Sequence, residues 1–268
     1  MLDRSTQPHR QDTKLQRVRG AAMVRLGRRG LLDLRQQGSA KAMLPRTDAP
    51  HPEVVFLNTA GGVTSGDRLD YALTVDGHAT GTTQTAERAY RAPDAPGEVR
   101  ITLDVTGRLD WLPQETILFE GSALRRRTDV RLGNDAEFLG VETLVLGRAA
   151  HGEVVRRITL DDHRRITRGG RLLYEEHLAL TSDILADPAC LGGARAMSTL
   201  VFLAPGAADA LGPIRDALGT DGHASAWDGR LVARLMAADA APLRRALIRA
   251  IVALRGDLPR VWPDEGAV

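Results

Sequence analysis

The sequence of 268 residues has little cysteine and no long apolar run. Its single cysteine, Cys190, excludes an intramolecular disulfide bond and a zinc site built from several cysteines. No stretch approaches the length of about 18 consecutive apolar residues that predicts a membrane-spanning helix. The first residues also lack the apolar segment of a secretory signal. We therefore expect a cytoplasmic protein without a membrane partner.

Aromatic residues are also scarce, at 4% of the chain, which is too few for the stacking platforms that bind single-stranded nucleic acid. The 36 Lys and Arg residues are balanced by 34 Asp and Glu residues and interleaved with them. We therefore predict no nucleic-acid partner. One basic run, the arginines at 125–127, is predicted to lie on one strand, so that at most the outer two face the same way. A solvated face is predicted for the run, with an acidic protein partner as the alternative.

The first two-thirds of the chain shows the period of two that is typical of half-buried β-strands. In residues 99–105 every second residue is apolar. Glycine, Asp-Gly and proline punctuate the segments, and helical periodicity is absent from the first 180 residues. The predicted strands cover residues 23–26, 31–34, 53–57, 71–75, 98–105, 115–119, 123–132, 153–160, 172–180 and 197–203.

The last quarter of the chain changes to helical periodicity. Residues 207–218 predict a short helix interrupted by Pro213, and residues 242–254 predict a better one. Asp239 or Ala240 lies near the start of the second helix, and Gly256 is suited to its C-cap. Its apolar stripe consists of Leu243, Ala246, Leu247, Ala250, Ile251 and Leu254.

No low-complexity linker separates the strand-rich part from the helical part. We therefore predict a single domain over residues 18–268, mostly β, with helices near its C-terminal end. The polar, aperiodic residues 1–17 are predicted to be a disordered lead-in.

Residues 58–67 contain the most conspicuous glycine motif. Gly61 and Gly66 have the spacing of a phosphate-binding loop, but Asp67 occupies the position where that loop needs a lysine. A carboxylate there repels phosphates, and no helical pattern follows. We therefore predict a tight, glycine-dependent turn capped by Asp67. Cys190 is predicted to lie in a loop, as an idle or packed thiol. We find no catalytic constellation, which favours a binding or scaffolding protein over an enzyme.

Six blocks, which occur in order between residues 58 and 262, together resemble one family, the urease accessory protein UreD, also called UreH. The first four match the patterns [PA]-G-G-x-x-x-G-D, T-Q-x-A-x-x-x-Y-R, W-x-P-Q-x-x-I-x-F and L-G-R-x-A-x-G-E. The fourth block carries His151, where methionine is commoner in the family. The blocks lie at residues 58–67, 83–91, 111–119, 146–153, 170–176 and 258–262.

The resemblance implies a largely β fold, with many strands in a β-helix-like or stacked-sheet arrangement and two helices. It also implies a non-enzymatic urease maturation factor. Members of the family bind UreF, recruit the GTPase UreG and dock on urease apoprotein to help deliver Ni²⁺ to its active site. We therefore expect a hetero-oligomeric complex, with dimerisation through UreF as one arrangement, and only transient Ni²⁺ rather than a tightly bound cofactor.

Two sets of residues within or beside these blocks are candidates for function. A hydrated path of weak oxygen ligands suits a metal ion that must be passed on. Turn caps and strand-end hydrogen bonds are the alternative role for each residue of this path, which we place at Asp67, Thr85, Glu142 and Glu176. Because Arg and Tyr are favoured interface anchors, partner binding is expected at or above Gly61, Gly62, Gln84, Tyr90, Arg91, Gln114 and Arg148.

Two other functions stay open at the level of sequence. A β-rich metal-dependent hydrolase could use His163, His177 and Glu176, and it would retain stoichiometric metal. A purely structural binding module would leave the nickel content of urease unchanged.

Overall fold

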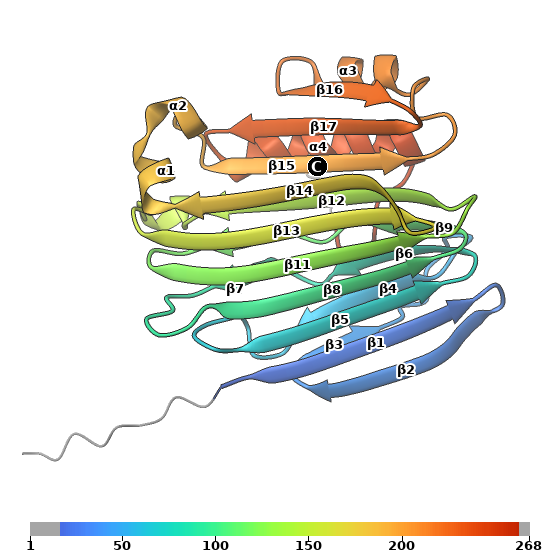
Figure 1. The fold of residues 1–268 in the computed structure, drawn as a ribbon, viewed down its shortest axis with the longest axis horizontal. Coiled ribbons are helices and arrows are strands. Elements are labelled where there is room, and N and C mark those ends of the chain that lie inside the picture. The colour runs from blue at the N-terminus through green and yellow to red at the C-terminus, as the bar shows by residue number, and fades with distance from the viewer. Residues whose placement is uncertain (1–16, 263–268) are drawn as a thin grey trace, which may run out of the picture.

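The computed structural model describes residues 17–262, in which two β-sheets are stacked face to face (Figure 1). We call the seven-stranded sheet sheet 1. Its order is β14 (Arg171–Thr181), β13 (Ile158–Arg168), β11 (Ser122–Leu132), β8 (Gly97–Val105), β5 (Arg68–Val75), β1 (Arg19–Gly27) and β2 (Gly30–Gly38).

The second sheet, sheet 2, contains ten strands and includes most of the short ones. Two of its strands lie off the main path, because β10 (Thr116–Leu118) pairs with both β12 and β7 (Glu87–Ala89). The main order is β16 (Gly222–Trp227), β17 (Arg230–Ala237), β15 (Ala196–Leu203), β12 (Glu137–Leu146), β9 (Arg108–Trp111), β6 (His78–Thr83), β4 (Glu53–Asn58) and β3 (Ala40–Met43).

Between β4 and β13 the chain alternates between the sheets, and each return adds a parallel strand. In sheet 1, β5 pairs with β8, β8 with β11, and β11 with β13, all in parallel. In sheet 2, the parallel series runs from β4 through β6 and β9 to β12. The chain is thus coiled as in a β-helix, which confirms the predicted fold class.

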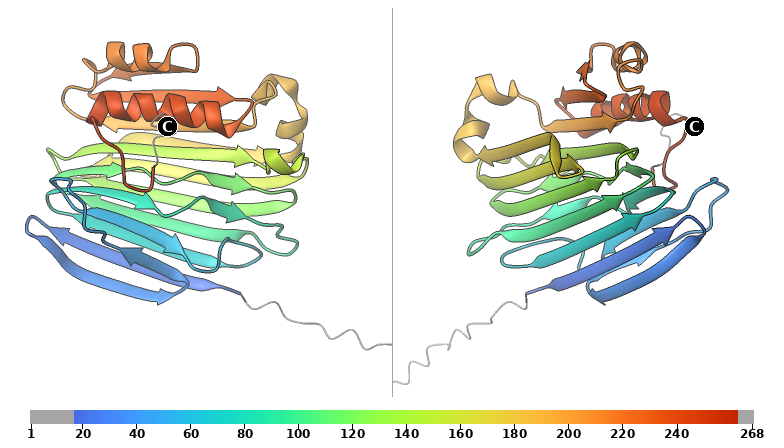
Figure 2. Two further views of the ribbon diagram at one scale, coloured as in Figure 1. Left: turned by 180° about the vertical axis from the view of Figure 1, so that it is seen from behind. Right: turned by 45° about the vertical axis from the view of Figure 1, so that its right-hand side comes forward.

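The helices lie mainly near the C-terminal end, as predicted. They are the two short helices α1 (Ser182–Ala186) and α2 (Pro188–Leu191), and the longer α3 (Leu211–Leu218) and α4 (Ala240–Arg255). A single 3₁₀ turn, η1, spans Ala149–His151. In Figure 2, α4 lies along the face of sheet 2 that is turned away from sheet 1. It contacts β15 and β17 through its buried apolar stripe and ends at Gly256 in the left-handed conformation.

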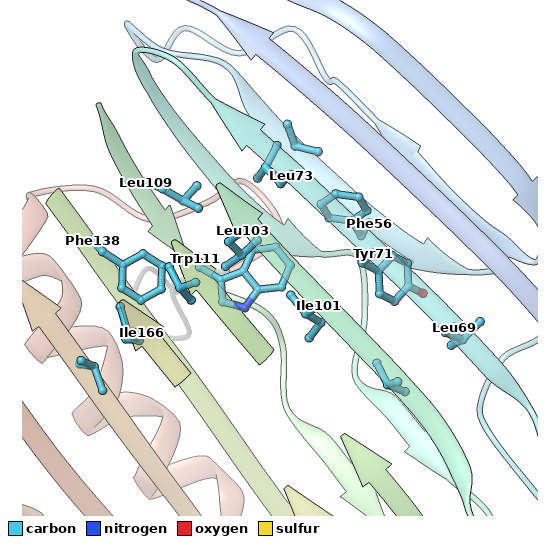
Figure 3. Close-up of a cluster of buried hydrophobic side chains, with 14 of the residues drawn as sticks. Phe56, Leu69, Tyr71, Leu73, Ile101, Leu103, Leu109, Trp111, Phe138 and Ile166 are labelled. Atoms are coloured by element: carbon cyan, nitrogen blue, oxygen red, sulfur yellow. The ribbon is translucent and has the colours of Figure 1, made fainter. Parts of the chain in front are cut away.

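Two apolar cores hold these layers together. The first fills the space between the sheets, where the ring centroid of Phe56 lies 5.3 Å from that of Tyr71 and 5.9 Å from that of Trp111 (Figure 3). The second lies between sheet 2 and the helices α3 and α4. Charged side chains that enter the first core are therefore surrounded by apolar groups.

Two local predictions are wrong. The strand expected over residues 153–160 begins only at Ile158, because the Glu153 carboxylate accepts the backbone N–H groups of Glu120 and Arg148 and holds a loop there. Cys190 lies in α2 rather than a loop, because the Asp187 side chain caps that helix. The lead-in predicted for residues 1–17 lies outside the described residues except for Arg17, and the single domain stays a prediction.

The glycine motif forms the expected tight turn. Asp67 is buried and its two carboxylate oxygens accept the backbone N–H groups of Val18 (2.7 Å) and Thr64 (2.9 Å). A Cβ atom on Gly62 would meet the Tyr90 ring and would lie 2.6 Å from the carbonyl oxygen of Arg88, whereas the φ of Gly61 is +77° with open space around it. The two glycines therefore serve different needs, close packing at Gly62 and backbone conformation at Gly61.

We predict that Gly62→Ala lowers the free energy of unfolding by about 3 kcal/mol. The new Cβ atom would collide with the backbone carbonyl of Arg88, which cannot move aside easily. Gly61→Ala, the matched control, should cost about 1 kcal/mol through its positive φ alone. Urea unfolding of both variants measures the difference. Equal losses would contradict the close approach at Gly62.

Candidate functional site between the two sheets

The middle residue of the three-arginine run points into the space between the sheets. The alternation along β11 leaves Arg125 and Arg127 exposed, whereas the side chain of Arg126 is only 5% exposed. Its Nε and Nη2 atoms donate to Asp162 Oδ1 (2.9 Å) and Oδ2 (2.7 Å) on the neighbouring strand β13. The outer arginines therefore share a solvated face, as predicted, and Arg126 points the other way. The buried carboxylate on the next strand compensates its charge in the core.

Further ion pairs extend from this contact to sheet 2. Arg164 also donates to Asp162, at 2.6 Å, and to Glu176, at 2.9 Å. The second oxygen of Glu176 pairs with Arg234 on β17, and Arg126 Nη1 lies 2.8 Å from Glu142 Oε2 on β12. We call these six residues, three acidic and three basic, the inter-sheet network: Arg126, Glu142, Asp162, Arg164, Glu176 and Arg234.

The two most deeply buried carboxylates of the network have opposite pKa shifts. Burial alone would raise the pKa of Asp162, but the charges and hydrogen bonds of Arg126 and Arg164 outweigh it and hold this pKa well below its ordinary value. For Glu142, burial prevails and raises the pKa, although Arg126 and Arg164 act against it. Repulsion from Asp162 adds to the raised pKa of Glu142. Of these two carboxylates, Glu142 is therefore the one that takes up a proton more readily.

A cavity of about 60 Å³ lies beside Glu142, and we call it the inter-sheet cavity. At about 15 Å³ for each water molecule, it has room for roughly four. The polar groups of its wall include those of Thr85, Glu87, Gln114, Thr116, Arg126 and Glu142. The wall therefore includes both the exposed Thr85 and the buried Glu142 of the network.

A second cavity, of about 30 Å³, lies on the other side of Glu142. Trp111 and Glu142 line both cavities, and Arg164 and Tyr174 line the second. Glu142 Oε1 is buried and accepts no hydrogen bond from the described residues. The indole N–H of Trp111 lowers the pKa of Glu142, although its geometry falls short of a hydrogen bond. The free oxygen of Glu142 can thus accept a hydrogen bond from water or bind a cation.

Glu87 is a cavity residue that the sequence analysis missed. Burial raises the pKa of its carboxyl group, and one carboxylate oxygen accepts the backbone N–H of Arg88 at 3.1 Å. Its only signal in the sequence was a position inside the block at residues 83–91, two residues after Thr85.

The four predicted nickel-path residues do not lie together. Thr85 and Glu142 line the inter-sheet cavity, and Glu176 belongs to the same network but lies beyond Arg164. Asp67 lies outside this cavity, in the glycine turn, and both its oxygens accept backbone N–H groups. Of the four residues, Thr85 and Glu142 are therefore the two that line the inter-sheet cavity. The nickel role of Asp67 stays a prediction.

Most of the predicted partner-binding residues gather around Tyr90. The Tyr90 hydroxyl donates to the carbonyl of Gly61 (3.4 Å), and its ring centroid lies 5.1 Å from that of Phe119. The Arg148 guanidinium lies 4.7 Å from the same Phe119 ring, and the backbone carbonyl of Arg91 accepts a hydrogen bond from Thr64. We call Gly61, Tyr90, Arg91, Phe119 and Arg148 the Tyr90 surface. Gly62 packs beneath it.

The two predicted glutamines lie elsewhere. Gln84 is exposed just after β6, but Gln114 is buried. The Gln114 amide donates to the carbonyl of Val261 (2.7 Å) and accepts from Arg244 (2.8 Å). Gln114 therefore holds the segment that follows α4 against sheet 2.

The residues of the alternative hydrolase are separated by the sheet. Glu176 points inward to Arg164, whereas His163 and His177 lie on the outer face and pair with carboxylates at 2.9 Å and 2.8 Å. In residues 17–262, no three His, Cys, Asp or Glu side chains converge as metal ligands do. No described helix is long and apolar enough to cross a membrane.

Fold and site together define a class of coiled, two-sheet β proteins with a charged cavity inside the core. The family model described as "UreD urease accessory protein" matches residues 17–263. A urease accessory protein UreD from Jannaschia sp. (strain CCS1) is 53% identical, with 98% of this chain and 99% of that protein covered. A namesake from Paracoccus denitrificans (strain Pd 1222) is 54% identical, with 93% of each covered. This chain therefore belongs to the UreD family of urease accessory proteins.

We predict that Asp162→Asn lowers the free energy of unfolding by about 3–5 kcal/mol at neutral pH, since it leaves two buried arginines short of negative charge. Folding lowers the pKa of Asp162. Its contribution to the free energy of unfolding is therefore fully present above the unfolded pKa of about 3.9, and it is lost as the pH falls from there toward the lower pKa of the folded state. The difference from the unmutated chain should therefore shrink in acid.

Urea unfolding over a series of pH values measures this. Asp104→Asn is the matched control, because Asp104 forms an exposed pair with Arg131 and should cost less than about 1 kcal/mol. A loss for Asp162→Asn that equals the control, or that does not change with pH, would contradict the buried charge pair.

Proposed function

We propose that this chain is a non-catalytic urease maturation factor that acts in the cytoplasm. In this role it binds UreF, recruits the GTPase UreG, docks on urease apoprotein and helps to deliver Ni²⁺. Membership of the UreD family supports the part in urease maturation. The observation that carries the nickel role is the inter-sheet cavity, whose wall includes the exposed Thr85 and the buried Glu142, and one oxygen of Glu142 accepts no hydrogen bond from the described residues.

The chemistry of the cavity suits a cation that passes through. Its polar wall offers hydroxyl, amide and carboxylate oxygens, which bind Ni²⁺ more weakly than imidazole or thiolate groups do. Arg126 lies 2.8 Å from Glu142 and opposes a resting divalent charge there. The carboxylates therefore attract the ion while the arginines shorten its stay, and Glu176 extends the same network toward β17.

The function is tested in cells that carry the urease structural genes, UreF and UreG, with or without this chain. We expect nickel-poor, inactive urease when the chain is absent and nickel-loaded, active urease when it is present. Full nickel loading without the chain would contradict the proposed function.

We predict that Glu142→Gln and Glu87→Gln each lower the nickel content of urease about tenfold, the effect of ~1.4 kcal/mol in a single binding step. Both changes keep the side-chain shape and remove the negative charge that attracts the cation. Metal analysis of purified urease is the measurement. Glu175→Gln, on the exposed outer face of β14, is the control and should leave nickel loading unchanged.

Pull-down of UreF and UreG with the same variants shows whether partner binding is intact. Normal nickel loading by both cavity variants would rule out a role of these carboxylates in the path, even if the chain itself is needed for maturation.

We predict that the Tyr90 surface binds one of the partner proteins, because Tyr90 is 41% exposed and Arg148 is also exposed on it. Tyr90→Ala and Arg148→Ala should weaken that contact about 30-fold or more, as expected for interface anchors worth about 2 kcal/mol. Separate pull-downs with UreF, the UreF–UreG complex and urease apoprotein identify the partner. Arg131→Ala, on the outer face of sheet 1, is the control. Unchanged binding to all three would contradict a docking role.

A further inference from the structure

The strand β2 forms an open edge of sheet 1. It pairs with β1 on one side, and within residues 17–262 its other side pairs with no strand (Figure 1). Eight of its nine residues pair with residues of β1, and the register shifts once, between Arg25 and Leu26 of β1. The unpaired backbone N–H and C=O groups of such an edge are a template for another strand.

Exposed apolar side chains gather along this edge, beside one charged pair formed by Asp33 and Arg35. Leu31 is 49% exposed and Leu32 is 62% exposed. Leu34 of β2 is also exposed, and so is Met43 of the neighbouring strand β3. The edge of β3 is covered differently, because the side-chain amide of Gln36 exchanges hydrogen bonds with the backbone N–H and carbonyl of Ala42. Sheet 2 is thus protected at this end of the molecule, whereas sheet 1 is not.

We propose that β2 pairs antiparallel with β2 of a second copy of this chain and joins the two copies of sheet 1. A two-fold axis at Leu34 places Leu34 opposite Leu34, and Asp33 of each copy opposite Arg35 of the other. Asp33 and Arg35 already lie on one face, with their charged atoms 3.0 Å apart. Directly opposite residues of an antiparallel pair share a face, so two ion pairs form across the interface.

The sequence of β2 favours this occupant and this register. The charge pattern about Leu34 is self-complementary, which a two-fold interface requires. Moving the axis to Asp33 or to Arg35 would bring like charges together, which is unfavourable. In the favoured register Leu34 of one copy covers Leu34 of the other, whereas Leu31 and Leu32 lie opposite Gln37 and Gln36. This pairing is separate from the cavity and from the Tyr90 surface, so it can fail while the proposed function holds.

Sedimentation equilibrium of the full chain tests the pairing over about a hundred-fold range of concentration, in which mass action separates monomer from dimer. Asp33→Arg gives β2 two positive charges, and Arg35→Asp gives it two negative charges. Each variant alone should raise the dimer dissociation constant at least about tenfold, because like charges then face each other. Mixing the two variants should restore dimers, since every cross-strand pair is again opposite in charge.

The double variant Asp33→Arg/Arg35→Asp is the matched control and should dimerise like the unmutated chain. A chain that stays monomeric throughout overturns the proposal, and so does a dimer that neither single change weakens. A chain without residues 1–16 is measured alongside. If only this shortened chain dimerises, the edge is covered by the chain's own N-terminal segment and the proposal is also overturned.

Discussion

Arg126 and Asp162 form an ion pair with two parallel hydrogen bonds between neighbouring strands, and both side chains are almost fully buried between the sheets. Neither charge can be removed alone without leaving the other unpaired in an apolar core. The pair also fixes the guanidinium beside Glu142. Asp162 accepts from its Nε and Nη2, while Nη1 donates to Thr116 and lies 2.8 Å from Oε2 of Glu142. The positive charge at the inter-sheet cavity is therefore held in place by this contact.

A network of three carboxylates and two arginines buried in the core, with only Arg234 reaching solvent, is not the most stable filling for a β core. Well-packed apolar residues of the same volume often give equal or greater stability. Stability alone does not account for these charges, whereas the cation transfer that we propose would give them a use. The coil brings the charges together, because the chain passes back and forth between the sheets. It places β11, β13 and β14 of sheet 1 opposite β10, β12 and β17 of sheet 2.

The sequence predicted correctly the strands and helices whose own apolar periodicity reveals their buried face. The alternation of residues 99–105 predicted β8, and the apolar stripe of residues 242–254 with its C-terminal glycine predicted α4. It missed β12, which is buried along nearly its whole length and therefore shows a continuous apolar run instead of alternation. It also missed short strands such as β7 and β9, whose pairing depends on the coil.

The site was only partly predictable for a similar reason. Alternation indicates that Arg126 faces opposite to its two neighbours, but not which face is buried. That depends on Asp162, 36 residues further along the chain. Glu142 and Glu176 came from the resemblance to UreD, and Glu87 carried no signal of burial. The central claim is that the charged interior serves nickel transfer, and replacing Glu87 and Glu142 together by glutamine tests it most directly. This change removes both carboxylate charges of the inter-sheet cavity and leaves the Arg126–Asp162 pair in place. The measurement is the nickel content of urease matured with that variant. The account predicts a folded chain that retains its partners but yields nickel-poor urease; nickel loading equal to that with the unmutated chain would contradict it.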